Sequence, residues 1–125
     1  MRELPVGFMN DDHRDFAELL ERVERQVAEE DSEVIDKALD LLIRHTREHF
    51  DREDEAMRAM NHFPPYEVHR GEHERVLKGL NIMLSAWKES HDRDQLKAGL
   101  ANLWAWFDIH LETMDAVTAQ FIARN

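Results

Sequence analysis

Apolar residues recur at intervals of three and four along most of this chain, which is the spacing of helices that bury one face in a core. The pattern predicts four helices, at about residues 11–30, 32–60, 65–90 and 95–121. Short connections make consecutive helices antiparallel neighbours. The expected fold is all-α, an up-down-up-down antiparallel four-helix bundle. Its apolar stripes comprise Phe16, Leu20, Val23, Val27, Ile35, Leu39, Leu42, Met57, Val76, Leu80, Met83, Trp87, Leu96, Leu100, Leu103, Phe107, Met114, Val117 and Phe121.

Residues with known preferences for helix ends support these boundaries. Asn10 or Asp11 suits the start of the first helix, because a short polar side chain can accept a hydrogen bond from a free backbone N–H there. The second helix should stop before Pro64 and Pro65, since a residue that precedes proline is pushed out of the helical region. Pro65 suits the first turn of the third helix. The length predicts a single domain over residues 1–125, with residues 1–10 as an N-terminal arm.

Glycines interrupt the helical pattern at three positions. Each costs about 1 kcal/mol relative to alanine inside a helix. They either permit a close approach between helices or are simply tolerated, and we favour the second interpretation. These glycines are Gly71, Gly79 and Gly99.

Seven polar residues lie on or beside the apolar stripes. A polar side chain at a core-facing position is costly unless something satisfies it, and one shared metal centre would satisfy the whole set. Taken singly, each histidine is more often a hydrogen-bonded core residue than a metal ligand. Together, at matching positions of four helices, they favour a metal site. The candidates are His13, His49, Glu53, His69, His73, His110 and Asp115.

Helix geometry predicts that these candidates meet at one end of the bundle. Residues four apart lie on the same helix face, so His69 and His73 can bind one ion, and His49 and Glu53 repeat that spacing. In an up-down bundle, the starts of the first and third helices lie level with the later parts of the second and fourth. Five imidazoles and two carboxylates are too many for one ion and suit two ions bridged by the carboxylates.

Two positions are less well determined by geometry. Asp115 follows His110 by five residues, which places it about 140° away around a helix. Geometry alone does not favour it over Asp108 or Glu112. His45 shares a helix face with His49, and could be an eighth ligand or a donor to a ligand, although a packing or hydrogen-bonding role is favoured.

The composition restricts the chemistry further. The chain has no cysteine, so any metal must be bound through nitrogen and oxygen. A formal net charge of −11 repels phosphate backbones and anionic lipids, which argues against nucleic-acid and membrane partners. Residues 1–9 include no long apolar run, so we expect neither a signal peptide nor a transmembrane span. We expect a cytoplasmic protein and favour a monomer.

Three spaced motifs resemble those of the hemerythrins, a family of non-haem di-iron oxygen carriers. Residues 49–54, His-Phe-Asp-Arg-Glu-Asp, are similar to the family's His-Phe-x-x-Glu-Glu. Residues 69–73 begin and end with histidine, like the family's paired histidines after a proline-containing loop. Residues 106–115 read Trp-x-x-x-His-x-x-x-x-Asp and match its last block, including the five-residue spacing that geometry left open. The resemblance covers nearly the whole chain.

The resemblance implies two iron ions, Fe2+ or Fe3+, with a bridging oxo or hydroxo group. One iron would have three histidines and the other two, and both carboxylates would bridge. The residues so implied are His69, His73 and His110 for one iron, His13 and His49 for the other, and Glu53 and Asp115 for the bridges. The iron with fewer ligands would take up oxygen, beside Trp106 and Phe107. The implied function is reversible dioxygen binding for storage, delivery or scavenging, and not an enzymatic one.

The chain departs from the family pattern at three places. Residues 9–12, Met-Asn-Asp-Asp, stand where the family has an apolar residue and an aspartate before its first ligand. His45 replaces a tyrosine, and Thr113 replaces an apolar pocket residue of oxygen-carrying members. The last two could change the pocket's polarity and the lifetime of bound oxygen. The alternatives are therefore a di-iron enzyme acting on peroxide or nitric oxide, an oxygen or redox sensor, and a structural zinc site.

Overall fold

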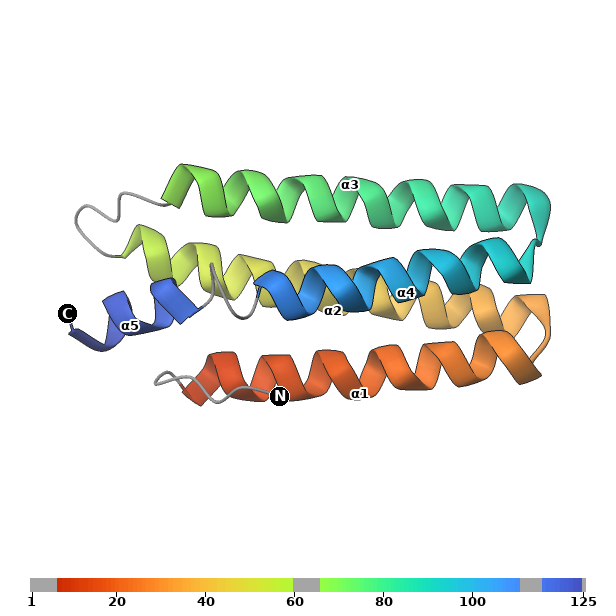
Figure 1. The fold of residues 1–125 in the computed structure, drawn as a ribbon, viewed down its shortest axis with the longest axis horizontal. Coiled ribbons are helices and arrows are strands. Elements are labelled where there is room, and N and C mark those ends of the chain that lie inside the picture. Colours follow the sequence, from red (N-terminus) through yellow and green to blue (C-terminus); the bar gives the residue numbers. More distant parts are fainter. Residues whose placement is uncertain (1–6, 60–65, 111–115, 125) are drawn as a thin grey trace.

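A computed structural model of the chain describes residues 7–59, 66–110 and 116–124. Four long helices run alternately in opposite directions and pack side by side (Figure 1). This arrangement confirms the predicted all-α up-down-up-down bundle. None of the helices in the described part of the chain is long and apolar enough to cross a membrane. The helices are α1 (Gly7–Glu29), α2 (Ser32–Arg58), α3 (Tyr66–Ser90), α4 (Arg93–His110) and α5 (Ala116–Arg124).

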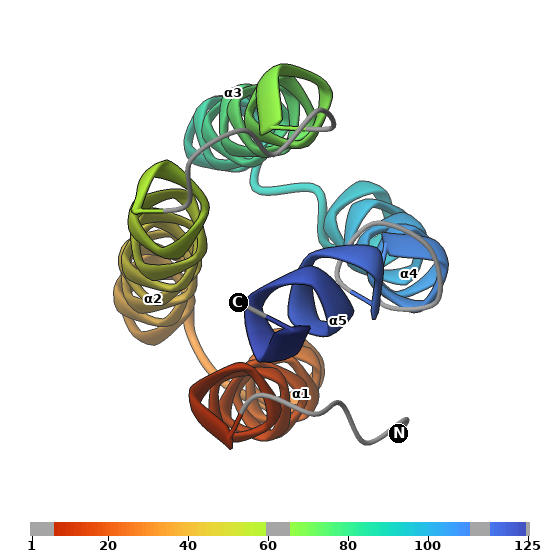
Figure 2. The same cartoon turned by 90° about the vertical axis from the view of Figure 1, so that its left-hand side faces the viewer.

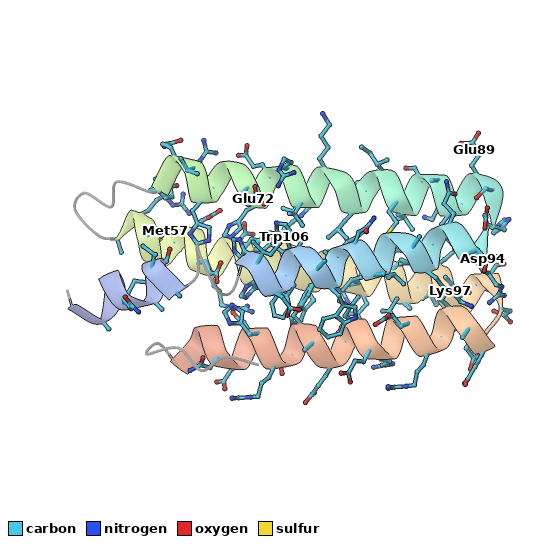
Figure 3. All side chains as sticks on the ribbon, viewed as in Figure 1. Met57, Glu72, Glu89, Asp94, Lys97 and Trp106 are labelled. Atoms are coloured by element: carbon cyan, nitrogen blue, oxygen red, sulfur yellow. The ribbon has the colours of Figure 1, made fainter. Side chains whose placement is uncertain are left out.

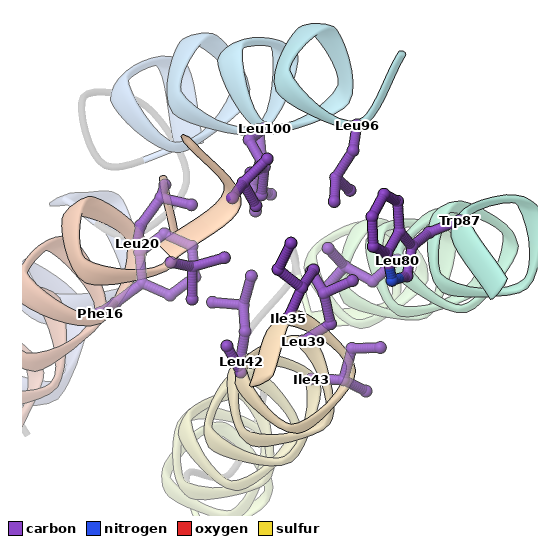
Figure 4. Close-up of a cluster of buried hydrophobic side chains, with 14 of the residues drawn as sticks. Phe16, Leu20, Ile35, Leu39, Leu42, Ile43, Leu80, Trp87, Leu96 and Leu100 are labelled. Atoms are coloured by element: carbon purple, nitrogen blue, oxygen red, sulfur yellow. The ribbon is translucent and has the colours of Figure 1, made fainter. Parts of the chain in front are cut away.

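The predicted apolar stripes form the core of the bundle. The stripes predicted for the first two helices are entirely buried, which confirms their helical period. Each long helix contributes a leucine that is at most 4% exposed and points towards the bundle axis (Figure 4), namely Leu20, Leu39, Leu80 and Leu100. Val76 and Met83 of α3 are buried less fully than predicted. They line a surface cavity of about 330 Å³ between α3 and α4.

The start of α2 carries an aspartate cap, but the prediction for the first helix is wrong. Asp31 accepts a hydrogen bond from the backbone N–H of Val34 at the start of α2, with a nitrogen–oxygen distance of 3.1 Å. The helix α1 begins at Gly7, so residues 7–10 belong to it rather than to an arm, and neither Asn10 nor Asp11 is its cap. No proline interrupts residues 7–10, so the backbone continues the helix towards the N-terminus. Pro64 and Pro65 lie outside the described residues.

The predicted fourth helix is observed as two separate elements, α4 and α5. In Figure 2, α5 lies across one end of the bundle, and it contacts α2. The apolar period does not continue in phase, because Val117 is 51% exposed whereas Thr118 and Ala119 are fully buried. One residue rotates a helix face by about 100°, so packing against α2 selects a face different from the one that the α4 stripe would continue. Met114 and the side chain of Phe121 lie outside the described residues.

Each pair of neighbouring long helices is joined by a side-chain hydrogen bond to a carboxylate. Three of the donors are indole N–H groups, which usually find a partner when they are buried. These contacts fix how far each helix can slide along its neighbour. The pairs are Arg52–Asp12 between α2 and α1, Trp87–Asp36 between α3 and α2, Trp106–Glu72 between α4 and α3, and Trp104–Glu24 between α4 and α1.

Alanine substitutions at two helical glycines test the packing between α3 and α4. We expect Gly79→Ala to raise the free energy of unfolding by about 1 kcal/mol, because alanine is the better helix former and its Cβ would meet no atom within 4 Å. A Cβ at Gly99 would lie 2.9 Å from the sulfur of Met83, so Gly99→Ala should raise the free energy of unfolding by less. Gly99 thus leaves room for the side chain of Met83 on α3 and is not merely tolerated. Urea unfolding measures both variants, and equal gains would contradict this packing.

Candidate metal centre

Six of the seven candidate residues converge inside the bundle, at the end where α5 lies. They come from all four long helices, and none is more than 3% exposed. This burial is unusual for polar residues unless they are paired or bind a metal. Asp115 lies outside the described residues, as does Thr113. The converging residues are His13 of α1, His49 and Glu53 of α2, His69 and His73 of α3, and His110 of α4.

The carboxylate of Glu53 lies between two groups of histidines. Its Oε1 is 3.1 Å from Nε2 of His73 and 3.7 Å from Nε2 of His69. Its Oε2 is 3.3 Å from Nε2 of His49 and 3.6 Å from Nε2 of His13. Each oxygen therefore faces a different group, which is the arrangement that a carboxylate needs to bridge two ions.

His110 completes the larger of the two groups. Its Nε2 is 3.2 Å from Nε2 of His69 and 3.3 Å from Nε2 of His73. Ligand atoms about 2.1 Å from one ion lie about 3.0–3.4 Å apart, since they subtend angles between 90° and 109° at the metal. Both groups have spacings near this range. The two sets of potential ligands are Glu53, His69, His73 and His110, and His13, His49 and Glu53.

Asp12 orients His49, which belongs to the smaller group. Its Oδ2 is 3.1 Å from Nδ1 of His49, and the guanidinium of Arg52 donates to both of its carboxylate oxygens. Burial by itself would raise the pKa of Asp12, but the hydrogen bonds from His49 and Arg52 outweigh it and lower the pKa to about 2. An anionic Asp12 holds the proton of His49 on Nδ1. Nε2, the atom that faces Glu53, is then the nitrogen that can bind a metal.

Two further contacts orient the larger group. Nδ1 of His73 lies 3.0 Å from Oδ1 of Asp54, and Nδ1 of His69 lies 2.8 Å from the hydroxyl of Thr118 on α5. Burial lowers the pKa of His73 to about 4, and the hydrogen bond to Asp54 opposes this shift only in part. His73 is therefore neutral at pH 7, which is the form that binds metals.

Aromatic rings enclose the cluster on several sides. Phe50 stacks on His73 with ring centroids 3.9 Å apart and an interplanar angle of 3°. Trp106 stacks on His110 at 4.5 Å and 23°. Phe107 meets His13 edge-on, at 5.7 Å and 74°. The aromatic enclosure excludes water and strengthens electrostatic interactions inside it. Trp106 and Phe107 lie against histidines of the two different groups.

His45 does not join either group among the described residues. It is partly buried and lines a surface cavity of about 540 Å³ between α1 and α2, together with Asp15, Arg22 and Leu41. Its position one turn before His49 gave it the same helix face in the sequence. The structure places it on the outer side of the α1–α2 contact, which favours the packing role over that of an eighth ligand.

The carboxylates and the hydroxyl that orient the histidines are not predicted by the sequence pattern. Asp12 stands within an unusual segment before His13, Asp54 stands within a motif, and Thr118 belongs to no motif. A carboxylate next to a candidate ligand is the one local signal that could have suggested Asp12. Thr118 had none, because its partner His69 is 49 residues away.

Fold and cluster together define a helical-bundle protein with a buried histidine–carboxylate cluster that can hold metal ions. A family model described as "Hemerythrin HHE cation binding domain" matches residues 4–122. The chain belongs to the hemerythrin family.

Two curated relatives agree with this assignment, and both are called bacteriohemerythrin. The chain is 27% identical to the protein of Aquifex aeolicus over 114 residues, which cover 90% of this chain and 86% of the relative. It is 32% identical to the protein of Ralstonia nicotianae over 90 residues, which cover 70% of this chain and 63% of the relative. No solved structure gives a significant match to this chain.

Proposed function

We propose that the chain binds two iron ions and takes up dioxygen reversibly, for storage, delivery or scavenging. The observation that carries the proposal is the position of Glu53, whose two oxygens face two separate groups of buried histidines. Imidazole and carboxylate ligands suit iron. The family assignment and the names of the two relatives support the same interpretation of the site.

The proposed ligands divide unequally between the two ions. Three histidines form one set of potential ligands with Glu53, and two histidines form the other set with it. Asp115 is proposed as the second bridge, on the sequence motif alone. A pair of ferrous ions held by these residues would supply the two electrons that dioxygen accepts on binding and returns on leaving. The two-histidine group has fewer protein ligands, so it is the group at which we propose that dioxygen binds.

The residues around the two-histidine group suit a binding role rather than a catalytic one. Phe107 lies edge-on against His13, and Phe16 packs on Phe107 with ring centroids 4.7 Å apart. These rings cover the group and keep bulk water away from it. Asp12 accepts from Nδ1 of His49, so Nε2 is the atom that would bind the metal, and a metal-bound Nε2 would have no proton to give to bound oxygen. Both features favour release of unreduced dioxygen.

The proposal includes no macromolecular partner. The net charge of −11 disfavours binding to nucleic acids and anionic membranes. A monomer in the cytoplasm remains our expectation from the sequence.

Repeated oxygenation tests the proposed function directly. We expect protein loaded with ferrous iron without air to change its absorption spectrum when exposed to air, and to recover the original spectrum when the oxygen is pumped away. Protein loaded with zinc in place of iron is the control and should show no change. A ferrous protein that passes straight to a stable ferric spectrum would contradict the carrier role, and would favour an enzyme acting on peroxide or nitric oxide, or a sensor.

Paired phenylalanine substitutions test which group takes up oxygen. We expect Phe107→Leu to shorten the lifetime of the oxygenated protein, because a smaller side chain beside His13 admits water. Phe50→Leu is the matched control, since Phe50 stacks on His73 in the other group. The rate of conversion to the ferric spectrum measures both. A larger effect from Phe50→Leu would assign oxygen binding to the three-histidine group instead.

A further inference from the structure

Trp106 links His110 to a charged pair on the surface of α3. Its ring stacks on the imidazole of His110 at 4.5 Å, and its indole N–H donates to Oε1 of Glu72. Arg75 in turn donates to both oxygens of Glu72, through Nε at 3.2 Å and Nη2 at 2.6 Å. Figure 3 shows Glu72 and Trp106 next to each other, where α3 and α4 meet. The orientation of the indole is thus fixed from two directions.

We infer that Trp106 is a positioning residue for His110, and that the chain Arg75–Glu72–Trp106 strengthens metal binding by the three-histidine group. The inference rests on the proposed metal centre. Stacking restricts the rotation of the His110 ring, so its Nε2 stays directed at His69 and His73 before a metal arrives. Less ordering is then required when the metal binds.

Electrostatics favour the metal-loaded state in the same way. An imidazole bound to a cation is electron-poor, and the face of an indole carries negative charge from its π system. The carboxylate of Glu72 accepts a hydrogen bond from the indole N–H and so raises the electron density of that ring. Trp106 therefore attracts His110 more strongly when His110 holds a metal. Phe50 covers His73 by stacking in a similar way, but a phenyl ring has no N–H through which a carboxylate could act.

Trp104 offers a matched control on the same helix. It also donates its indole N–H to a carboxylate of a neighbouring helix, that of Glu24 on α1. Its ring contacts Phe107, with centroids 6.3 Å apart, and not a histidine of the cluster. Both tryptophans therefore join helices through the same kind of hydrogen bond. Only Trp106 combines that bond with stacking on a proposed ligand.

The test compares cobalt(II) release and stability in four full-length variants: Trp106→Leu, Trp106→Phe, Glu72→Gln and Trp104→Phe. Cobalt(II) is a redox-stable probe with a spectrum that reports the geometry of its ligands. Each protein is loaded to saturation, and release to an excess of chelator is followed by absorption. Urea unfolding of the metal-free proteins measures the loss of the helix-joining hydrogen bond separately.

We expect Trp106→Leu to release one of two cobalt equivalents about tenfold faster than the wild type, as is typical when a group behind a metal ligand is lost. Trp106→Phe keeps the stacking and Glu72→Gln keeps an acceptor, so both should show smaller increases. Trp104→Phe should lower the stability of the metal-free protein about as much as Trp106→Phe does, yet leave cobalt release unchanged.

Equal release rates in the wild type and Trp106→Leu would overturn the inference and leave the metal centre standing. Faster release from Trp104→Phe, to the same extent as from Trp106→Phe, would also overturn it, since a general loss of packing would then explain both. A wild type that holds no cobalt would overturn the metal centre and this inference together.

Discussion

Glu53→Gln should lose most of its iron from both groups at once, which is the largest effect that we expect from a single substitution. The carboxylate of Glu53 faces His73 with one oxygen and His49 with the other. Glutamine has nearly the same size, but it is neutral and presents only one oxygen, so it cannot bridge two cations. Metal analysis after anaerobic ferrous loading and removal of free iron should show two ions per chain in the wild type and close to none in the variant.

Two further variants show whether this effect is specific to the bridging position. Glu55→Gln removes a carboxylate from the same helix, but Glu55 is exposed and pairs with Arg58, so the iron content should not change. His13→Ala removes a residue from the smaller group only and should leave the three-histidine group loaded. An iron content for Glu53→Gln equal to that of the wild type would contradict the bridging role. A wild type with one tightly bound ion, or with zinc in every preparation, would contradict the iron pair.

Removing the metal should lower the melting temperature of the protein substantially while leaving it largely helical. The metal-free protein keeps five imidazoles and the Glu53 carboxylate buried in its interior, and buried polar groups without full compensation are costly. Metal binding to the native state adds RT ln(1 + [L]/Kd), about 4 kcal/mol at a free concentration of 1,000 times Kd. Thermal unfolding followed by circular dichroism, with and without ferrous iron under nitrogen, measures the difference.

Glu53→Gln is also the control for the stability measurement. Its melting temperature should respond little to iron, because the bridging carboxylate is gone. Equal melting temperatures for iron-loaded and iron-free wild type, with the iron content verified, would mean that these residues do not form a metal site in the native state.

The helical elements could be predicted from the sequence because their signals are local. The stripe from Phe16 to Val27 and the stripe from Ile35 to Met57 each follow a period of 3.6 residues, and both are buried as predicted. Asp31 caps the start of α2 for an equally local reason, since its side chain accepts a hydrogen bond from a backbone N–H three residues away. The start of α1 was placed too late because Asn10 and Asp11 resemble caps, although the helix continues through them.

In the fourth predicted helix, the local apolar period is not sufficient to predict which face is buried. The sequence pattern runs through Val117, but the structure leaves Val117 exposed and buries Thr118 instead. The choice of face depends on contacts with α2 and with His69, which are distant in the sequence. No period within residues 95–121 contains that information.

The candidate site follows the same division between local and distant information. The pairs His49–Glu53 and His69–His73 are four residues apart, so helix geometry puts each pair on one face whatever the rest of the chain does. The alternating helix directions then bring His13 of α1 and His110 of α4 into the two groups that share Glu53. Asp115 stays a prediction from its motif, because it lies outside the described residues.

The sequence by itself determined the four amphipathic helices, the antiparallel bundle and the residue types that gather at one end of it, because the spacing of apolar and polar positions directs each helix face towards or away from the core. Only the tertiary structure decided which oxygen of Glu53 faces which histidines, that Asp12 and Arg52 meet behind His49, and that Trp106 lies flat on His110. These contacts join residues far apart in the chain. They depend on the rotation and relative height of packed helices. The spacing of residues within a single helix does not determine either of these.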